Sequence, residues 1–129
     1  MVRGLMLDIE AARKNPFTAG LFTGKVALVT GGGTGIGRAT ALELAALGCK
    51  VAICGRKLDK LEPTIAELGA LTHADGAMGE TCDIREPEQV ARLVDAVLAR
   101  FGRIDVLVNN AGGQFPSPAM HITPRGWEA

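Results

Sequence analysis

The stretch from Val26 to Gly37 reads VALVTGGGTGIG, and an apolar helical pattern over Ala39–Leu47 follows it. The first five residues predict a buried strand that runs into a glycine-rich turn. Glycine lets the backbone turn sharply and lets a ligand approach it closely. The helix that follows adds free N–H groups and the positive end of its dipole. Strand, turn and helix together predict a cradle for the diphosphate of a dinucleotide.

The spacing of the glycines narrows the kind of site. They follow the pattern Thr-Gly-x-x-x-Gly-x-Gly rather than Gly-x-Gly-x-x-Gly. A Walker phosphate loop is excluded, since no Gly-Lys-Ser/Thr stands at the required spacing. A merely flexible glycine loop is the alternative, but the strand before it and the helix after it argue against that. We expect the turn to contact the dinucleotide through Gly31, Thr34, Gly35, Ile36 and Gly37.

Composition limits the chain to one domain and excludes several classes of partner. The chain has 129 residues, 47% of them hydrophobic, which is enough for a core. Fourteen basic and fourteen acidic residues cancel, so no basic patch predicts a nucleic-acid partner. Apolar runs reach only strand length, and charges interrupt the N-terminus, so neither a membrane span nor a signal peptide is predicted. We expect an intracellular protein, cytoplasmic or, in a eukaryote, peroxisomal.

The three cysteines predict core residues rather than a disulfide scaffold or a metal site. Cys49 and Cys54 flank a predicted strand at a spacing that places their sulfurs on opposite faces. They therefore cannot share a metal ion, and no metal site is expected.

Apolar strands alternate with helical patterns, which predicts βαβ units and a parallel sheet. We expect an α/β fold, a Rossmann-like doubly wound sheet with strand order 3-2-1-4. An arm, residues 1–24, precedes a partial Rossmann domain, residues 25–129. Pro63 predicts a kink or a restart within the second helix, and residues 69–79 read as a loop. The strands are expected at Val26–Thr30, Val51–Cys54, Met78–Cys82 and Ile104–Val108, and the helices at Arg38–Leu47, at Leu58–Leu68 and from after Glu86 to Gly102.

The end of the second strand indicates which dinucleotide binds. An NAD-binding site of this type usually has a carboxylate there, which accepts from the ribose hydroxyls and repels a 2′-phosphate. In this chain Gly55 takes the acidic position and Arg56 follows it. A guanidinium meets a phosphate with a planar fork of donors. The sequence therefore predicts NADP(H) over NAD(H), although Arg56 and Lys57 could instead form a solvated pair that opens a helix.

Three motifs together resemble the short-chain dehydrogenase/reductase family. They are the glycine turn, Cys82-Asp83-Ile84 after the third strand, and Asn109-Asn110-Ala111-Gly112 after the fourth. The resemblance implies that Asp83 and Ile84 hold the adenine, and that Asn110, Ala111 and Gly112 pass beside the cofactor. Asp83 could also cap the following helix, and the two roles are compatible.

The residues after Gly112, including Gly113–Ala119, resemble the branch of peroxisomal trans-2-enoyl-CoA reductases. This implies an NADPH-dependent reduction of trans-2-enoyl-CoA thioesters in fatty acid metabolism, by a parent protein that is a homo-oligomer. A 2,4-dienoyl-CoA reductase or a 3-oxoacyl-type reductase is the alternative parent. Phe115, Pro116 and Met120 could line an acyl pocket or simply pack the loop.

The catalytic Ser, Tyr and Lys that the resemblance implies have no matching positions here. The chain contains no tyrosine, and Ser117 is its only serine. A sheet that stops at the strand Ile104–Val108 would leave a long apolar edge. Thr123 and Pro124 begin a helix that the chain does not complete. We therefore expect a truncated chain without catalytic residues, inactive by itself; a non-catalytic nucleotide-binding fragment is the second hypothesis.

Overall fold

Four parallel strands form one sheet with the order β3-β2-β1-β4. The computed structural model describes residues 17–113 and 116–127; the first part of the predicted arm therefore lies outside the described residues. The pairing runs continuously from Val26↔Lys50 to Thr30↔Cys54 between the two central strands. The predicted fold class and strand order are confirmed. The strands are β1 (Val26–Thr30), β2 (Lys50–Gly55), β3 (Ala77–Thr81) and β4 (Val106–Val108).

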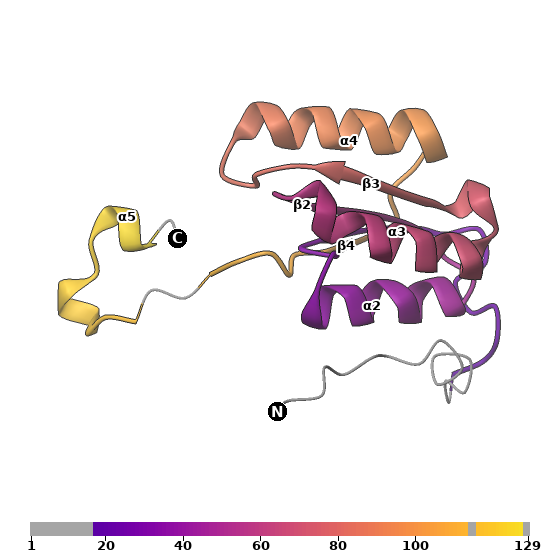
Figure 1. Cartoon of the computed structure of the whole chain (residues 1–129), viewed down its shortest axis with the longest axis horizontal. Coiled ribbons are helices and arrows are strands. Elements are labelled where there is room, and N and C mark those ends of the chain that lie inside the picture. The colour runs from indigo at the N-terminus through magenta and orange to yellow at the C-terminus, as the bar shows by residue number, and fades with distance from the viewer. Residues whose placement is uncertain (1–16, 114–115, 128–129) are drawn as a thin grey trace.

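Three long helices cover the sheet from both faces. They are α2 (Gly35–Ala46), α3 (Leu58–Thr72) and α4 (Pro87–Phe101). Helices α2 and α3 lie on one face and α4 lies on the other (Figure 1). Pro87 begins α4 and Gly102 ends it in the left-handed conformation, at φ 78°, as the sequence predicts. Such βαβ units place the amino ends of α2 and α3 beside the carboxyl ends of the strands.

Alternate side chains of the central strands pack into two separate hydrophobic cores. Ala27, Val29 and Ile53 pack with α2 and α3, whereas Leu28 and Ala52 pack toward α4. All five are at most 3% exposed. Full burial of one aliphatic side chain stabilises the fold by roughly 1.5–3 kcal/mol. The two covered faces of β1 and β2 therefore hold the glycine turn on a rigid base.

Helix α3 differs from its prediction, because it runs through Pro63 to Thr72 without a restart. The first N–H groups of a helix have no hydrogen-bond partner within it. Pro63 is the sixth residue of α3, so its missing N–H removes one hydrogen bond close to the start of the helix. Leu68 is fully buried and Leu71 packs on the same core, which favours the extra turn. The predicted loop is reduced to His73 and a short 3₁₀ turn, η1 (Ala74–Gly76).

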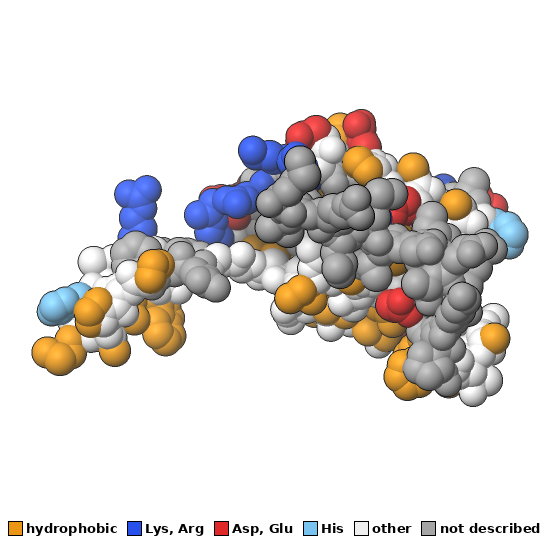
Figure 2. Space-filling view, turned by 60° about the horizontal axis from the view of Figure 1, so that its bottom comes forward, with side chains coloured by type: hydrophobic (Ala, Val, Ile, Leu, Met, Phe, Trp, Pro, Cys, Tyr) orange, Lys and Arg blue, Asp and Glu red, His pale blue; other side chains and the backbone are white. Residues whose placement is uncertain are grey.

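The β4 side of the sheet is less complete. Within the described residues β4 pairs only with β1, and Leu107 is 56% exposed. The chain then extends away through η2 (Ala119–His121) to α5 (Pro124–Trp127) (Figure 1). Apolar side chains gather on this projecting segment (Figure 2), and both Met120 and Trp127 are more than four-fifths exposed. Thr123 Oγ1 accepts from the N–H of Gly126 at 3.1 Å, which confirms the predicted helix start.

None of the helices in the described part of the chain is long and apolar enough to cross a membrane.

Candidate nucleotide-binding site

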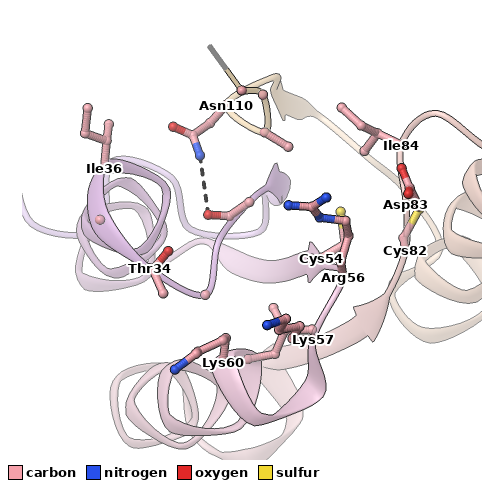
Figure 3. Close-up of a pocket in the computed structure, with 18 of the residues that line it drawn as sticks. Thr34, Ile36, Cys54, Arg56, Lys57, Lys60, Cys82, Asp83, Ile84 and Asn110 are labelled. Carbon is pink, nitrogen blue, oxygen red and sulfur yellow. Dashed lines mark hydrogen bonds between the residues drawn. The ribbon is translucent and has the colours of Figure 1, made fainter. Parts of the chain in front are cut away.

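A cavity of about 620 Å³ lies at the carboxyl ends of β1, β2 and β3. It contains every predicted site residue except Gly37. Thr34 and Ile36 lie toward one end, Asp83 and Ile84 toward the other, and Arg56 between them (Figure 3). Ligands of open α/β sheets bind at this edge. The structure therefore brings together the predicted residues Gly31, Thr34, Gly35, Ile36, Arg56, Asp83, Ile84, Asn110, Ala111 and Gly112.

The glycine turn has a backbone that side chains other than glycine rarely permit. Gly31 and Gly35 have φ angles of +66° and +54°. Helix α2 begins at Gly35, and its N-cap residue Thr34 makes no side-chain capping bond. The first N–H groups of α2 thus lack a side-chain cap at the wall of the cavity. Such an amino end attracts an anion through its N–H groups and its dipole.

Gly37 lies behind the cavity instead of lining it. A Cβ atom there would stand 2.3 Å from the Gly31 carbonyl oxygen and 2.4 Å from Asn110 Nδ2. The residue is required because the first turn of α2 packs directly on the backbone of the glycine turn. Its predicted contact with the dinucleotide is therefore indirect in this structure.

Thr30 and Asn110 fasten the end of β4 to the glycine turn. Thr30 Oγ1 accepts from the N–H groups of Asn110 and Ala111 at 3.0 and 2.9 Å. Asn110 Nδ2 donates to the carbonyl oxygens of Thr30 and Gly31 at 3.0 and 3.3 Å, the second of which is drawn in Figure 3. The turn therefore has a second support besides β1.

Helix α3 provides a third support, which sequence reasoning missed. Thr64 is fully buried, and its Oγ1 donates to the carbonyl oxygen of Gly33 at 3.2 Å. A Cβ at Gly33 would lie 2.7 Å from the carbonyl oxygen of Lys60. A threonine in a helical pattern gives no sign of a bond to a distant loop, so only the packing of α3 reveals it.

A basic rim surrounds the amino end of α3, made of Arg56, Lys57 and Lys60 (Figure 3). Lys57 is the N-cap of α3 and makes no side-chain capping bond. The rim therefore joins three cationic side chains to a second uncapped helix start. Lys60, in the first turn of α3, was missed as a residue of this rim.

Asp83 lies past the end of β3 and is held by Arg85. Arg85 Nε donates to Asp83 Oδ1 at 2.9 Å, and Nη2 donates to Oδ2 at 2.6 Å. These bonds and the N–H of Arg85 hold the pKa of the Asp83 carboxyl well below its usual range. The N-cap of α4 is Glu86. The alternative that Asp83 caps this helix is therefore wrong.

The cysteines are buried and form no disulfide. Cys49 belongs to the core under α2 and α3, and Cys54 and Cys82 to the core under α4, as the strand spacing predicts. Burial raises the pKa of Cys49 and Cys54 to about 11. No cluster of three metal-ligating side chains occurs among residues 17–113 and 116–127.

Of the residues considered for an acyl pocket, the two that the structure describes do not line this cavity. Pro116 and Met120 lie on the projecting segment, and Met120 is 92% exposed. Phe115 lies outside the described residues. The described part of the cavity thus has groups that can bind a nucleotide.

Comparisons with known proteins identify the family of this chain. The family model for short chain dehydrogenase matches residues 25–129. The probable 2,4-dienoyl-CoA reductase 3 of Caenorhabditis elegans is 44% identical over 108 residues, covering 81% of this chain and 34% of the relative.

Two solved structures show the same arrangement. The citronellol catabolism dehydrogenase of Pseudomonas aeruginosa PAO1 is 50% identical with a TM-score of 0.73, covering 88% of this chain and 46% of that one. A metagenomic short-chain oxidoreductase solved in complex with NADP is 39% identical with a TM-score of 0.70, covering 83% and 48%. The chain therefore spans between a third and a half of the length of these proteins.

Proposed function

Since the chain belongs to the short-chain dehydrogenase family, we propose that residues 25–129 form the NADP(H)-binding part of a reductase. The observation that carries this proposal is the cavity itself. It combines a glycine turn at an uncapped helix start with a basic rim at the end of the neighbouring strand.

Each part of the cofactor has a matching group of residues. The diphosphate would lie against Gly31, Gly35 and the amino end of α2. A 2′-phosphate would lie at Arg56 and the uncapped start of α3, where Gly55 takes the position of the usual acidic residue. The adenine would reach Asp83 and Ile84, whereas the nicotinamide half would pass Asn110, Ala111 and Gly112. A solved relative in complex with NADP supports this choice of cofactor.

The proposed substrate is an acyl-CoA thioester with a double bond conjugated to its carbonyl. The bound cofactor supplies the hydride, and the residues of this chain bind and orient it. The continuation after Gly112 supports a trans-2-enoyl-CoA thioester. A relative named as a probable 2,4-dienoyl-CoA reductase favours a dienoyl-CoA as the second candidate.

We propose that this chain binds the cofactor but does not by itself catalyse the reduction. Its sequence contains no tyrosine to polarise the thioester carbonyl. We expect pure protein to bind NADPH but to oxidise none of it when crotonyl-CoA is added. Turnover above background would contradict this part of the proposal. The homo-oligomeric parent and its cytoplasmic or peroxisomal compartment stay predictions.

Titration with NADPH and NADH tests the cofactor. Wild type is expected to bind NADPH about tenfold or more tightly than NADH, because a charge-assisted bond to phosphate contributes roughly 1.5–3 kcal/mol. Arg56→Asp should reverse the preference. Arg100→Asp makes the same change of charge at the far end of α4 and should leave it unchanged. An Arg56→Asp protein with the wild-type ratio would refute the assignment of NADP(H).

A further inference from the structure

Arg85 saturates most of the hydrogen-bonding capacity of Asp83. Its backbone N–H donates to Asp83 Oδ1 at 3.1 Å, in addition to the two guanidinium bonds. A carboxylate accepts about four hydrogen bonds, two at each oxygen. Oδ1 therefore has both of its acceptor sites filled, whereas Oδ2 keeps one.

The Asp83 backbone is fixed as well. Its N–H donates to Gln89 Oε1 at 2.9 Å, which ties the residue to the first turns of α4. The carboxylate can neither rotate freely nor gain a proton easily while the guanidinium is bound to it. It is therefore an oriented group that can only accept hydrogen bonds.

Both partners line the cavity, and Asp83 lies at the end away from Thr34 (Figure 3). If the diphosphate lies on the glycine turn and the ribose at Arg56, the base must lie at this end. The next step therefore rests on the proposed function.

We propose that Arg85 is a positioning residue, which orients Asp83 so that the site selects a 6-aminopurine over a 6-oxopurine. The exocyclic amino group of adenine would donate to the remaining acceptor site of Asp83 Oδ2. A 6-oxopurine would instead place its carbonyl oxygen against the carboxylate, where two acceptors repel each other. Without Arg85 the Asp83 carboxylate could rotate away from the carbonyl oxygen or take up a proton, and the selection would weaken.

The molecule contains a matched control for this pair. Arg103 donates to Asp105 from Nε and Nη2 at 3.0 and 2.5 Å, again across one intervening residue. The Arg103 side chain is 54% exposed and that of Arg85 is 56% exposed. The Arg103 pair precedes β4 at the opposite end of the sheet from the cavity, so its loss should not affect the base.

Fluorescence titration of the whole chain with NADPH and with its reduced hypoxanthine analogue tests the proposal. Wild type should bind NADPH about tenfold or more tightly than the analogue. Arg85→Met should reduce this ratio to about twofold or less. Arg85→Lys, which keeps the charge but not the fork of donors, should fall between them. Arg103→Met should keep the wild-type ratio.

The outcomes separate this inference from the proposed function. If the adenine lies at Asp83, Asp83→Asn should lose the preference for NADPH over the hypoxanthine analogue, whatever the role of Arg85. If Asp83→Asn loses it but Arg85→Met retains it, the role of Arg85 is refuted and the cofactor site stands. If wild type binds both nucleotides equally, the selection itself is refuted. If wild type binds neither, the proposed function fails first.

Discussion

The two sides of the sheet differ in how completely their strands are covered. On the covered side, β1, β2 and β3 lie between helices, and Val51 and Ile53 are fully buried. On the open side, β4 and residues 109–127 leave Leu107, Met120 and Trp127 exposed. Strands β2 and β4 are both largely apolar, so the difference lies in which described helices pack on them. The cavity is lined mainly by the covered side, and nucleotide binding should follow its stability.

Removal of a buried side chain should separate the two sides most strongly. Ile53→Ala is expected to lower the free energy of unfolding by about 3 kcal/mol, because a fully buried residue leaves a cavity. Leu107→Ala should cost less than about 0.5 kcal/mol, since half of the side chain already meets solvent. Urea unfolding measures both. Ile53→Val, at about 1 kcal/mol, is a milder substitute if the first variant does not fold. Equal losses at the two positions would contradict the comparison.

Gly37 and Gly112 sharpen the comparison at the backbone. Gly37→Ala forces a Cβ into the Gly31 carbonyl and is expected to cost about 2 kcal/mol and to weaken NADPH binding. Gly112, on the open side, has no atom of the described residues within 4 Å of a Cβ built on it, so alanine there should leave stability nearly unchanged. Thermal unfolding of both variants gives the test, and a comparable loss in Gly112→Ala would refute it.

Asn110 joins the two sides, so its removal tests whether they are coupled. Asn110→Ala breaks both bonds from Nδ2 to the glycine turn and is expected to cost about 1–2 kcal/mol. Asn109→Ala changes the exposed neighbour and should cost less than about 0.5 kcal/mol. If the two substitutions proved equivalent in urea unfolding, the end of β4 would not support the turn.

The smallest expected effect is a pH dependence at the start of β4. Arg103 and the N–H of Val26 hold the pKa of Asp105 below its usual range. A lowered pKa in the folded state adds stability above the unfolded value of about 3.9, and this is lost as pH falls through the folded pKa. Asp105→Asn should therefore be less stable than wild type at pH 7, with a difference that shrinks below about pH 3.9. A difference that stays constant across this range would point to another cause.

Much of the fold was predictable because the signals are local. A strand of four apolar residues and Thr30, a glycine turn and an apolar helical pattern follow one another within Val26–Ala46, and βαβ connections then leave few strand orders. The predicted restart at Pro63 and the helix end at Leu68 were wrong, because the burial of Leu68 and the packing of Leu71 favour a longer helix. Packing decided the length of α3, and no local pattern contains that information.

The candidate site was predictable to a similar extent. Gly31 and Arg56 directly follow strands and Asn110 follows one two residues later, where the topology gathers side chains at one edge. Thr64 and Arg85 were missed for a different reason. Each acts through another residue, and neither a helical threonine nor an Asp-x-Arg sequence reveals its partner. Contacts of this second kind appear only when the elements have been placed in space.

The buried thiols make each layer of the molecule separately observable. Cys49 reports on the layer of α2 and α3, and Cys54 and Cys82 report on the layer of α4. Burial keeps reagents away from these thiols and raises their pKa further above neutral pH, so an alkylating reagent should modify them mainly when their layer opens. Mass spectrometry of the labelled peptides would then give the rate at which each layer opens, without any engineered probe.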